Sequence, residues 1–145
     1  MNLPSVLFTL GLFALGNNAM VQASSDVEVF KSPTCGCCGQ WVEHMRKAGF
    51  QVTVHNVLDT SATRRKLGIP DRVGSCHTAT VGGYAIEGHV PAADVKRLLF
   101  EKSKAIGLAV PSMPPGSPGM ESPNPVPYET LLVKSDGSTQ VFARH

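Results

Sequence analysis

The chain has 145 residues, enough for one domain with a hydrophobic core. Hydrophobic residues make up 42% of it and charged residues 17%, a balance that excludes an intrinsically disordered protein. The net charge of +2 is too small for a nucleic-acid-binding surface, and we expect the one basic run, Arg64-Arg65-Lys66, to be a solvated helix end. These properties predict a folded protein with no nucleic-acid partner.

The first 23 residues are predicted to be a secretory signal peptide. An apolar run from Val6 to Leu15 is far shorter than the roughly 20 residues of a membrane-spanning helix. Val21-Gln22-Ala23 then offers a cleavage site, although Met1-Asn2 lacks the usual Lys or Arg. A buried N-terminal helix is the alternative. We expect a periplasmic protein that begins at Ser24 and has no stable membrane insertion after signal removal.

The first predicted elements alternate between strands and helices. Asp26–Lys31 alternates polar and apolar residues and is predicted to be a strand. Residues 38–48 have the spacing of an amphipathic helix that Gly49 ends. A strand over Gln51–Val57 and a short helix over Ser61–Leu67 are expected to follow.

A hairpin and a third helix come next. Thr78–Val81 and Tyr84–Ile86 flank Gly82-Gly83, a two-residue turn signal. Pro91 then opens a helix that is expected to run to about Lys102. The resulting order, β-α-β-α-β-β-α, with cysteines at the first strand-to-helix junction, predicts a thioredoxin-like α/β fold. A ferredoxin-like sandwich is the main alternative.

The composition changes near the C-terminus. Residues 107–127 hold seven prolines and three glycines, so we expect an extended, stiffened loop that is neither helix nor sheet. Glu129–Lys134 and Thr139–Ala143 then predict a terminal β-hairpin. The expected organisation is a signal peptide (1–23), a metal-binding domain (24–106), and a loop (107–127) and hairpin (128–145) packed on that domain.

Three cysteines within four positions carry the main chemical signal. Cys35, Cys37 and Cys38 lie at the predicted start of a helix, where the helix dipole and free N–H groups favour thiolate. Sulfurs this close together suit bridging of soft cations. Cys35 and Cys38 also have the C-x-x-C spacing of redox-active proteins, and a plain stabilising disulfide is a third interpretation.

Cys76 favours metal binding over thiol–disulfide exchange. In a thioredoxin-like fold the loop before the third strand lies against the start of the first helix, and redox members normally carry a proline there. This loop instead contains Cys76 and His77, so we expect a fourth sulfur and an imidazole beside the other cysteines. Thiolates and the thioethers of Met113 and Met120 select Cu(I), whereas zinc seldom uses methionine.

The remaining polar candidates are weaker. His89, which precedes the third helix, is a candidate ligand, with a hydrogen bond at the helix entry as the alternative. We expect His44 and His55 to be ordinary surface residues and His145 to be a free terminus. Asp94 is expected to be part of a helix start.

Four ordered motifs span nearly all of the chain after the predicted signal. They are Thr34-Cys-Gly-Cys-Cys38, Ser75-Cys-His-Thr-Ala79, Tyr84-Ala-Ile-Glu-Gly-His-Val-Pro91 and Gly107 to Glu121, GLAVPSMPPGSPGME. Together they resemble the exported copper-resistance family CopG. Ser112 departs from the family pattern, in which glycine is expected before the first methionine, and is expected to stiffen or shift the loop slightly.

The resemblance implies a thioredoxin-like fold and a cysteine-bridged multinuclear copper site, with a part in copper resistance through Cu(I)/Cu(II) interconversion. The metal-site residues that it supports are Cys35, Cys37, Cys38, Cys76, His77, His89, Met113 and Met120. Copper ions and other periplasmic copper-handling proteins are the expected partners. A thiol–disulfide oxidoreductase that uses Cys35 and Cys38, or a zinc-binding structural module, remains an alternative. We expect no hydrolase or transferase activity.

Removal of residues 1–23 is the first testable prediction. The short apolar run and the small residues after it are those of a cleaved signal, so the exported protein should begin at or near Ser24. N-terminal sequencing of protein from the periplasmic fraction measures this directly. An intact Met1 on a membrane-retained chain would show that the prediction is wrong.

Overall fold

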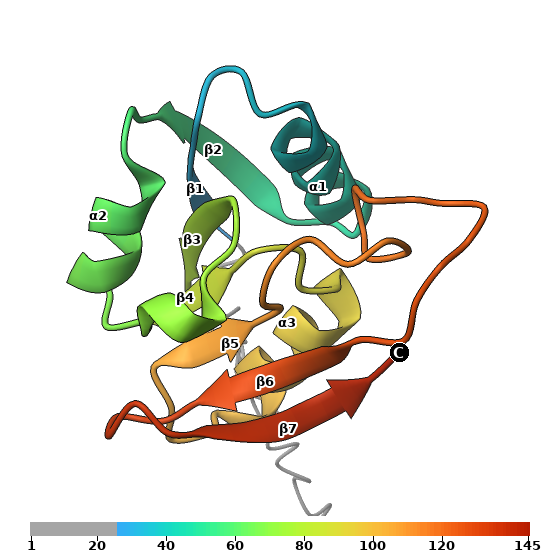
Figure 1. Cartoon of the computed structure of the whole chain (residues 1–145). Coiled ribbons are helices and arrows are strands. Elements are labelled where there is room, and N and C mark those ends of the chain that lie inside the picture. Colours follow the sequence, from blue (N-terminus) through green and yellow to red (C-terminus); the bar gives the residue numbers. More distant parts are fainter. Residues whose placement is uncertain (1–25) are drawn as a thin grey trace, which may run out of the picture.

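The computed structural model describes residues 26–145, which form one seven-stranded mixed sheet with three α-helices (Figure 1). The elements in chain order are β1 (Asp26–Lys31), α1 (Gly36–Lys47), β2 (Gln51–Asn56), α2 (Thr60–Lys66), a 3₁₀ turn η1 (Asp71–Val73), β3 (His77–Val81), β4 (Tyr84–Glu87), α3 (Ala92–Glu101), β5 (Gly107–Ala109), β6 (Glu129–Val133) and β7 (Thr139–Arg144). The strand order across the sheet is β2-β1-β3-β4-β5-β6-β7.

The predicted signal peptide and its cleavage site before Ser24 lie outside the described residues. Within residues 26–145, none of the helices combines the length and the apolar character that crossing a membrane requires.

Strand direction decides which loops meet. β1 pairs with β2 in parallel and with β3 in antiparallel orientation, so the end of β1 lies beside the beginning of β3. In this register Lys31 is opposite His77. The loop that leads from β1 into α1 and the loop that leads into β3 therefore leave the sheet at the same edge, which places two distant cysteine segments together.

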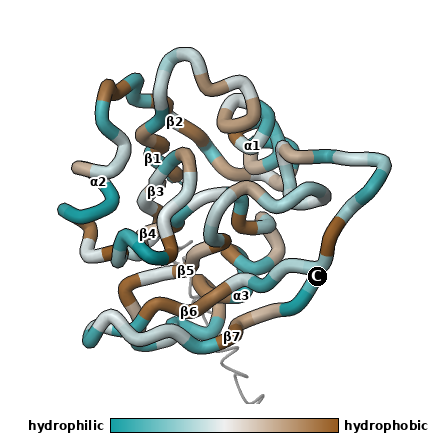
Figure 2. The backbone as a smooth tube through the Cα atoms, in the orientation of Figure 1, coloured by the Kyte–Doolittle hydropathy of each residue, from teal (hydrophilic) through white to brown (hydrophobic). Residues whose placement is uncertain are grey.

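Residues on neighbouring positions of the central strands pack on opposite faces of the sheet. Ile86 and Leu108 join a core with Trp41 of α1 and Leu98 of α3. Ala85 and Ala109 join a smaller core on the other face, where the segment after α2 packs. Figure 1 shows α1 and α2 on opposite sides of the strands. Figure 2 shows hydrophobic colour along β6 and mostly white to hydrophilic colour along the loop before it.

The loop expected over residues 107–127 is wrong at its first three residues. Gly107–Ala109 is the strand β5, which lies between β4 and β6 in the sheet. The strand has only three residues and begins with glycine, so the sequence shows no alternating pattern there. Gly107 allows close packing, because a Cβ there would lie 1.6 Å from the Ala85 carbonyl oxygen. The loop that remains runs over residues 110–128.

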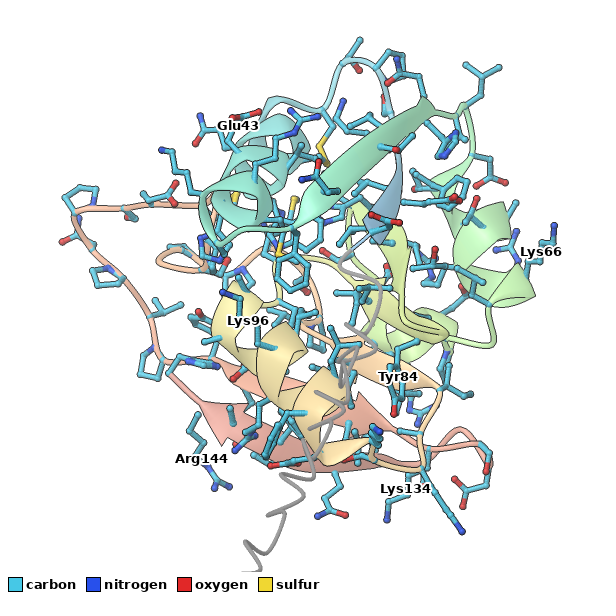
Figure 3. The ribbon with its side chains drawn as sticks, turned by 180° about the vertical axis from the view of Figure 1, so that it is seen from behind. Glu43, Lys66, Tyr84, Lys96, Lys134 and Arg144 are labelled. Atoms are coloured by element: carbon cyan, nitrogen blue, oxygen red, sulfur yellow. A yellow bond between two sulfur atoms is a disulfide. The ribbon has the colours of Figure 1, made fainter. Side chains whose placement is uncertain are left out.

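Asp94 lies in the first turn of α3, as predicted, and it also binds the C-terminal residue His145. Asp94 is buried, and its carboxylate accepts hydrogen bonds from Thr130 Oγ1 at 2.7 Å and His145 Nε2 at 3.0 Å. The backbone of His145 also pairs with Tyr128. The prediction that His145 is a free terminus is wrong, because this side chain ties the end of the chain to α3. Charged side chains such as Lys66, Lys134 and Arg144 lie at the periphery (Figure 3).

Two predictions for the other histidines differ in outcome. His44 is half-buried and its Nε2 accepts a hydrogen bond from the backbone N–H of Ala92 at 3.0 Å, so it connects α1 to the start of α3. The prediction of an ordinary surface residue is therefore wrong for His44. His55 stacks on Phe30 with ring centroids 4.8 Å apart and keeps 41% of its side chain exposed, as expected of a surface residue.

Candidate metal centre

The start of α1 holds three of the four cysteines. Cys35 is the N-cap residue, and its Sγ accepts a hydrogen bond from the backbone N–H of Cys38 at 3.3 Å. The helix consequently begins at Gly36, two residues earlier than the sequence predicts. Cys35 and Cys38 are joined by a disulfide, while Cys37 and Cys76 are free thiols.

Cys76 reaches the same place from the loop before β3. The Sγ atoms of the four cysteines all lie within 4.8 Å of one another. Cys35 Sγ and Cys37 Sγ are 3.5 Å apart, and Cys38 Sγ lies 3.8 Å from the Cys76 carbonyl oxygen. The structure thus brings together sulfurs that the sequence separates by up to 41 positions, since the group runs from Cys35 to Cys76. Figure 3 shows sulfur atoms gathered beside α1.

Two imidazoles form a second group with Cys76. Its Sγ lies 3.0 Å from His89 Nε2 and 3.3 Å from His77 Nδ1, and the donor atoms of the three residues fall within 4.8 Å of one another. Cys76 is therefore common to an all-sulfur group and a mixed sulfur–nitrogen group. Cys76 lies in the loop before β3, His77 opens β3, and His89 follows the turn after β4.

His89 is oriented by the loop that follows β5. Its Nδ1 lies 2.8 Å from the Pro118 carbonyl oxygen, which only accepts, so Nδ1 carries the proton and donates it. Nε2 is left with a lone pair directed at Cys76. Burial lowers the pKa of His89, which favours the neutral ring. Metal-binding histidines typically have this arrangement, with one ring nitrogen donating to a carbonyl and the other available to the metal.

His77 is fully buried against Trp41, with ring centroids 4.5 Å apart. Burial, and secondarily the neighbouring His89 and Lys31, lower the pKa of His77 to about 3. Its Nε2 is buried and has no hydrogen-bond partner among the described residues. The nitrogen near Cys76 is Nδ1, 3.3 Å from its Sγ. A neutral ring with the proton on Nε2 leaves the lone pair of Nδ1 available to a metal.

Cys76 is protonated in the metal-free protein at neutral pH. Burial, followed by the nearby Cys37 sulfur, raises the pKa of the Cys76 thiol to about 12. The thiol can donate its proton to the lone pair of His89 Nε2, 3.0 Å away. A metal ion that takes Cys76 as a thiolate must displace this proton, so binding would release protons.

The loop over residues 110–128 covers one side of the centre. Met113 is 44% exposed, and its Sδ lies 4.0 Å from Cys37 Sγ. Met120 takes part through its backbone, which bonds to Ser117 and Gly116, and no hydrogen bond joins its sulfur to the described residues of the centre. The structure thus brings the Met113 sulfur to the cysteines.

Gly119 allows this loop to approach α1. A Cβ there would lie 2.8 Å from both the Cys37 carbonyl oxygen and the backbone nitrogen of Trp41, and 3.3 Å from His89 Nδ1. Its φ of +85° also lies in the left-handed region. The adjacent Pro118 carbonyl can therefore reach His89. Ser112 has a φ of +61°, a conformation in which glycine is favoured, which explains the glycine expected there from the family pattern.

The polar support of the Cys76 loop was not predicted from the sequence. Glu87 and Ser75 were not singled out as functional residues. Glu87 is the last residue of β4, a strand of otherwise mostly apolar residues, and it is fully buried. A charged residue at an inward-facing strand position was the available signal, since such residues are almost never buried without partners.

Comparison with known proteins agrees with this geometry. A family model described as "Protein of unknown function, DUF411" matches residues 73–120. Two solved structures, titled "Copper resistance protein copG", Form 1 and Form 2, are 41% identical to this chain, with TM-scores of 0.78 and 0.79. The matches cover 83% of this chain and 96% and 97% of those chains. The chain belongs to the CopG copper-resistance family.

A search of the curated proteins gives no match. Membership of the CopG family, together with the four converging sulfurs, supports a copper-related function for this chain. The donor set fits copper, because its sulfurs are soft ligands and its two buried imidazoles are neutral.

The lowered pKa of His77 gives the second testable prediction. In the metal-free protein the folded-state pKa is about 3, whereas the unfolded chain has the ordinary value of 6.5. Between these values the unfolded state binds a proton that the folded state does not. The contribution of His77 to stability is therefore present above pH 6.5 and is lost as the pH falls toward 3.

NMR titration of the imidazole nitrogens measures this at a single site. We expect the His77 ring in the folded, metal-free protein to stay neutral down to about pH 4. In concentrated urea, which serves as the control, the same ring should titrate near 6.5. A midpoint near 6.5 in the folded protein would contradict the buried, uncharged environment.

Proposed function

We propose that this protein binds Cu(I) in a cysteine-bridged, multinuclear site and acts in copper resistance. The observation that carries the proposal is the convergence of four Sγ atoms within 4.8 Å. Thiolates select Cu(I) over harder cations, and sulfurs this close together are placed to share ions between them. The name of the two similar structures, copper resistance protein, supports the same metal.

The proposed ligands extend beyond the cysteines. His77 and His89 would hold copper with Cys76 on one side of the centre, since their neutral rings lie near its sulfur. Met113 would supply a thioether beside Cys37. Met120 is not among the ligands of this proposal, because the hydrogen bonds that hold it in the loop are those of its backbone.

The proposal includes interconversion of Cu(I) and Cu(II). The thiolates of Cys35 and Cys38 together can give two electrons, one to each of two Cu(II) ions. The products are two Cu(I) ions and the Cys35–Cys38 disulfide that the structure contains. A disulfide at the start of a helix after the first strand, with residue 76 in the loop before β3, also supports a thioredoxin-like origin of the fold.

We further propose that the protein works in the periplasm, with copper ions and other copper-handling proteins as its partners. The N-terminal sequence pattern supports export. The Cys35–Cys38 disulfide suits an oxidising compartment, where bound metal would protect the remaining thiols.

Anaerobic titration of the reduced protein with Cu(I), with bound metal measured by elemental analysis, tests the main proposal. Cys76→Ser should lower the copper stoichiometry or affinity about as much as Cys38→Ser, because both sulfurs belong to one group. Circular dichroism serves to show that each variant is folded. If Cys76→Ser binds copper like the wild type while Cys38→Ser does not, the shared site is refuted. Zinc retained in preference to Cu(I) would favour a structural zinc module.

Met113 and Met120 offer a matched pair of substitutions. Leucine keeps the size and apolar character of methionine but removes the thioether. Met113→Leu should lose Cu(I) to a competing chelator about tenfold more readily than the wild type, a change equal to about 1.4 kcal/mol. Met120→Leu should stay within about threefold of the wild type. Equal effects of the two substitutions would show that the loop closes differently around copper.

A thiol–disulfide oxidoreductase is the second candidate, because the Cys35–Cys38 disulfide has the C-x-x-C spacing. The same Met113→Leu protein separates the two functions. Efficient reduction of a model protein disulfide by the wild type and the variant alike, with unchanged copper retention, would favour the oxidoreductase.

A further inference from the structure

A buried carboxylate supports the loop that carries Cys76. Glu87 is the last residue of β4 and is fully buried. Its Oε1 accepts a hydrogen bond from the backbone N–H of Ser75 at 2.6 Å, and its Oε2 accepts one from Thr78 Oγ1 at 2.5 Å. Ser75 is the residue directly before Cys76, so the carboxylate fixes the backbone next to the Cys76 thiol.

Arg64 provides the opposite charge. Its Nη1 lies 3.4 Å from Glu87 Oε1, and its Nη2 and Nε bond to Asp71 Oδ1 at 2.9 and 3.1 Å. The Arg64 side chain is only 11% exposed, so the prediction that this basic run is a solvated helix end is wrong at Arg64. A Cβ at Gly74 would lie 2.8 Å from Arg64 Cζ, which shows how closely the guanidinium packs beneath the loop.

Ser75 also connects Cys76 to the loop of Met113. Its hydroxyl donates a hydrogen bond to the Ser112 carbonyl oxygen, and the Ser112 N–H donates to the Gly74 carbonyl at 3.1 Å. The two segments are therefore held to each other immediately before Cys76 and immediately before Met113. A continuous set of polar contacts runs from Arg64 through Glu87 and Ser75 to Ser112.

A carboxylate is costly to bury, and it persists in an interior when hydrogen bonds and an opposite charge compensate for lost hydration. Glu87 has both kinds of partner. Bonds to an ionised acceptor are also stronger and more directional than neutral ones. The carboxylate is consequently suited to fix a loop. Within residues 26–145, its two oxygens bond to Ser75 and Thr78 and not to Cys76 Sγ.

We propose that Glu87 is a positioning residue, which holds Cys76 at the metal centre through the backbone of Ser75, and Met113 through Ser75 and Ser112. The relevance of this role to copper rests on the function proposed above. The positioning itself is a property of the metal-free protein, so the two proposals can fail separately.

Cysteine labelling in the metal-free, oxidised protein tests the positioning without copper. The Cys35–Cys38 disulfide leaves Cys37 and Cys76 free, and peptide mapping after alkylation gives a rate for each thiol. Glu87→Leu removes the acceptor for Ser75 at similar volume. We expect the labelling rate of Cys76, relative to that of Cys37, to rise about tenfold, the factor that corresponds to loss of one buried hydrogen bond.

Glu87→Gln is the conservative variant. Its amide oxygen can still accept from Ser75, and its NH₂ group can donate to Thr78 Oγ1, so the geometry is retained without the charge. We expect Cys76 labelling within about twofold of the wild type. Labelling as fast as in Glu87→Leu would overturn positioning by hydrogen bonds.

Asp94→Leu is the matched control, because Asp94 is another buried carboxylate whose hydroxyl and imidazole partners, Thr130 and His145, are not residues of the centre. It should leave Cys76 labelling unchanged. An equal rise in both leucine variants, or no rise in Glu87→Leu, would overturn the proposal. If Glu87→Leu does not fold, Thr78→Val, which removes one bond to the carboxylate, should raise the rate about threefold, and no rise would be equally decisive.

Competition with a Cu(I) chelator then connects the position of Cys76 to copper. Glu87→Leu should release copper about tenfold more readily, whereas Glu87→Gln and Asp94→Leu should match the wild type within about threefold. Unchanged copper retention in a Glu87→Leu protein with fast Cys76 labelling would overturn the role at the metal centre. Absence of copper binding by the wild type would refute the proposed function alone, since the labelling result stands by itself.

Discussion

The antiparallel pairing of β1 with β3 is the constraint on which the centre depends. Because Lys31 is opposite His77, the chain leaves β1 and enters β3 at one edge of the sheet. Cys35 follows Lys31 by four positions and caps α1, while Cys76 directly precedes His77. A shift of the register by one residue would turn His77 to the opposite face, away from Trp41, and separate the sulfurs. The register of the sheet therefore sets the distances between the donor atoms of the centre.

The donor atoms of the centre change from sulfur near the surface to nitrogen in the interior. Cys37 and Met113 lie toward solvent, whereas His77 and His89 are fully buried. Cys76 stands between them and belongs to both groups. Its burial keeps the Cys76 thiol protonated in the absence of metal. Cys76, His77 and His89 are therefore all uncharged in the metal-free protein. A cation entering from the Met113 side would meet accessible sulfur before it meets imidazole.

Local signals in the sequence were sufficient for most elements and for the cysteine cluster. Alternation predicted β1, and turn glycines predicted the β3–β4 hairpin. The meeting of Cys76 with the other cysteines followed from the expected fold and from the resemblance to CopG. Sequence patterns do not predict elements whose determining contacts are tertiary. β5 is too short to show a period, and its place is set by pairing with β4 and β6.

The polar residues show the same division. Nothing local to His145 indicates that Asp94, 51 positions away, accepts its hydrogen bond. The supporting role of Glu87 is likewise invisible without Arg64 and Ser75, which other segments supply. Met113 and Met120 lie in the same proline-rich segment, and only the structure shows that the Met113 sulfur lies beside Cys37. Burial and long-range hydrogen bonds, which have no periodic signature, account for these differences.

The pairing of β5 with β6 has an evolutionary consequence. The segment over residues 110–128 leaves the sheet from one strand and returns to its immediate neighbour, so its two ends are held together whatever lies between them. The entropic cost of closing such a loop grows only slowly with its length. Insertions, deletions and exchanges of donor residues in this segment can therefore accumulate without refolding the sheet. Relatives with this scaffold can therefore change the residues that this loop presents to the centre, while the cysteines at α1 stay where they are.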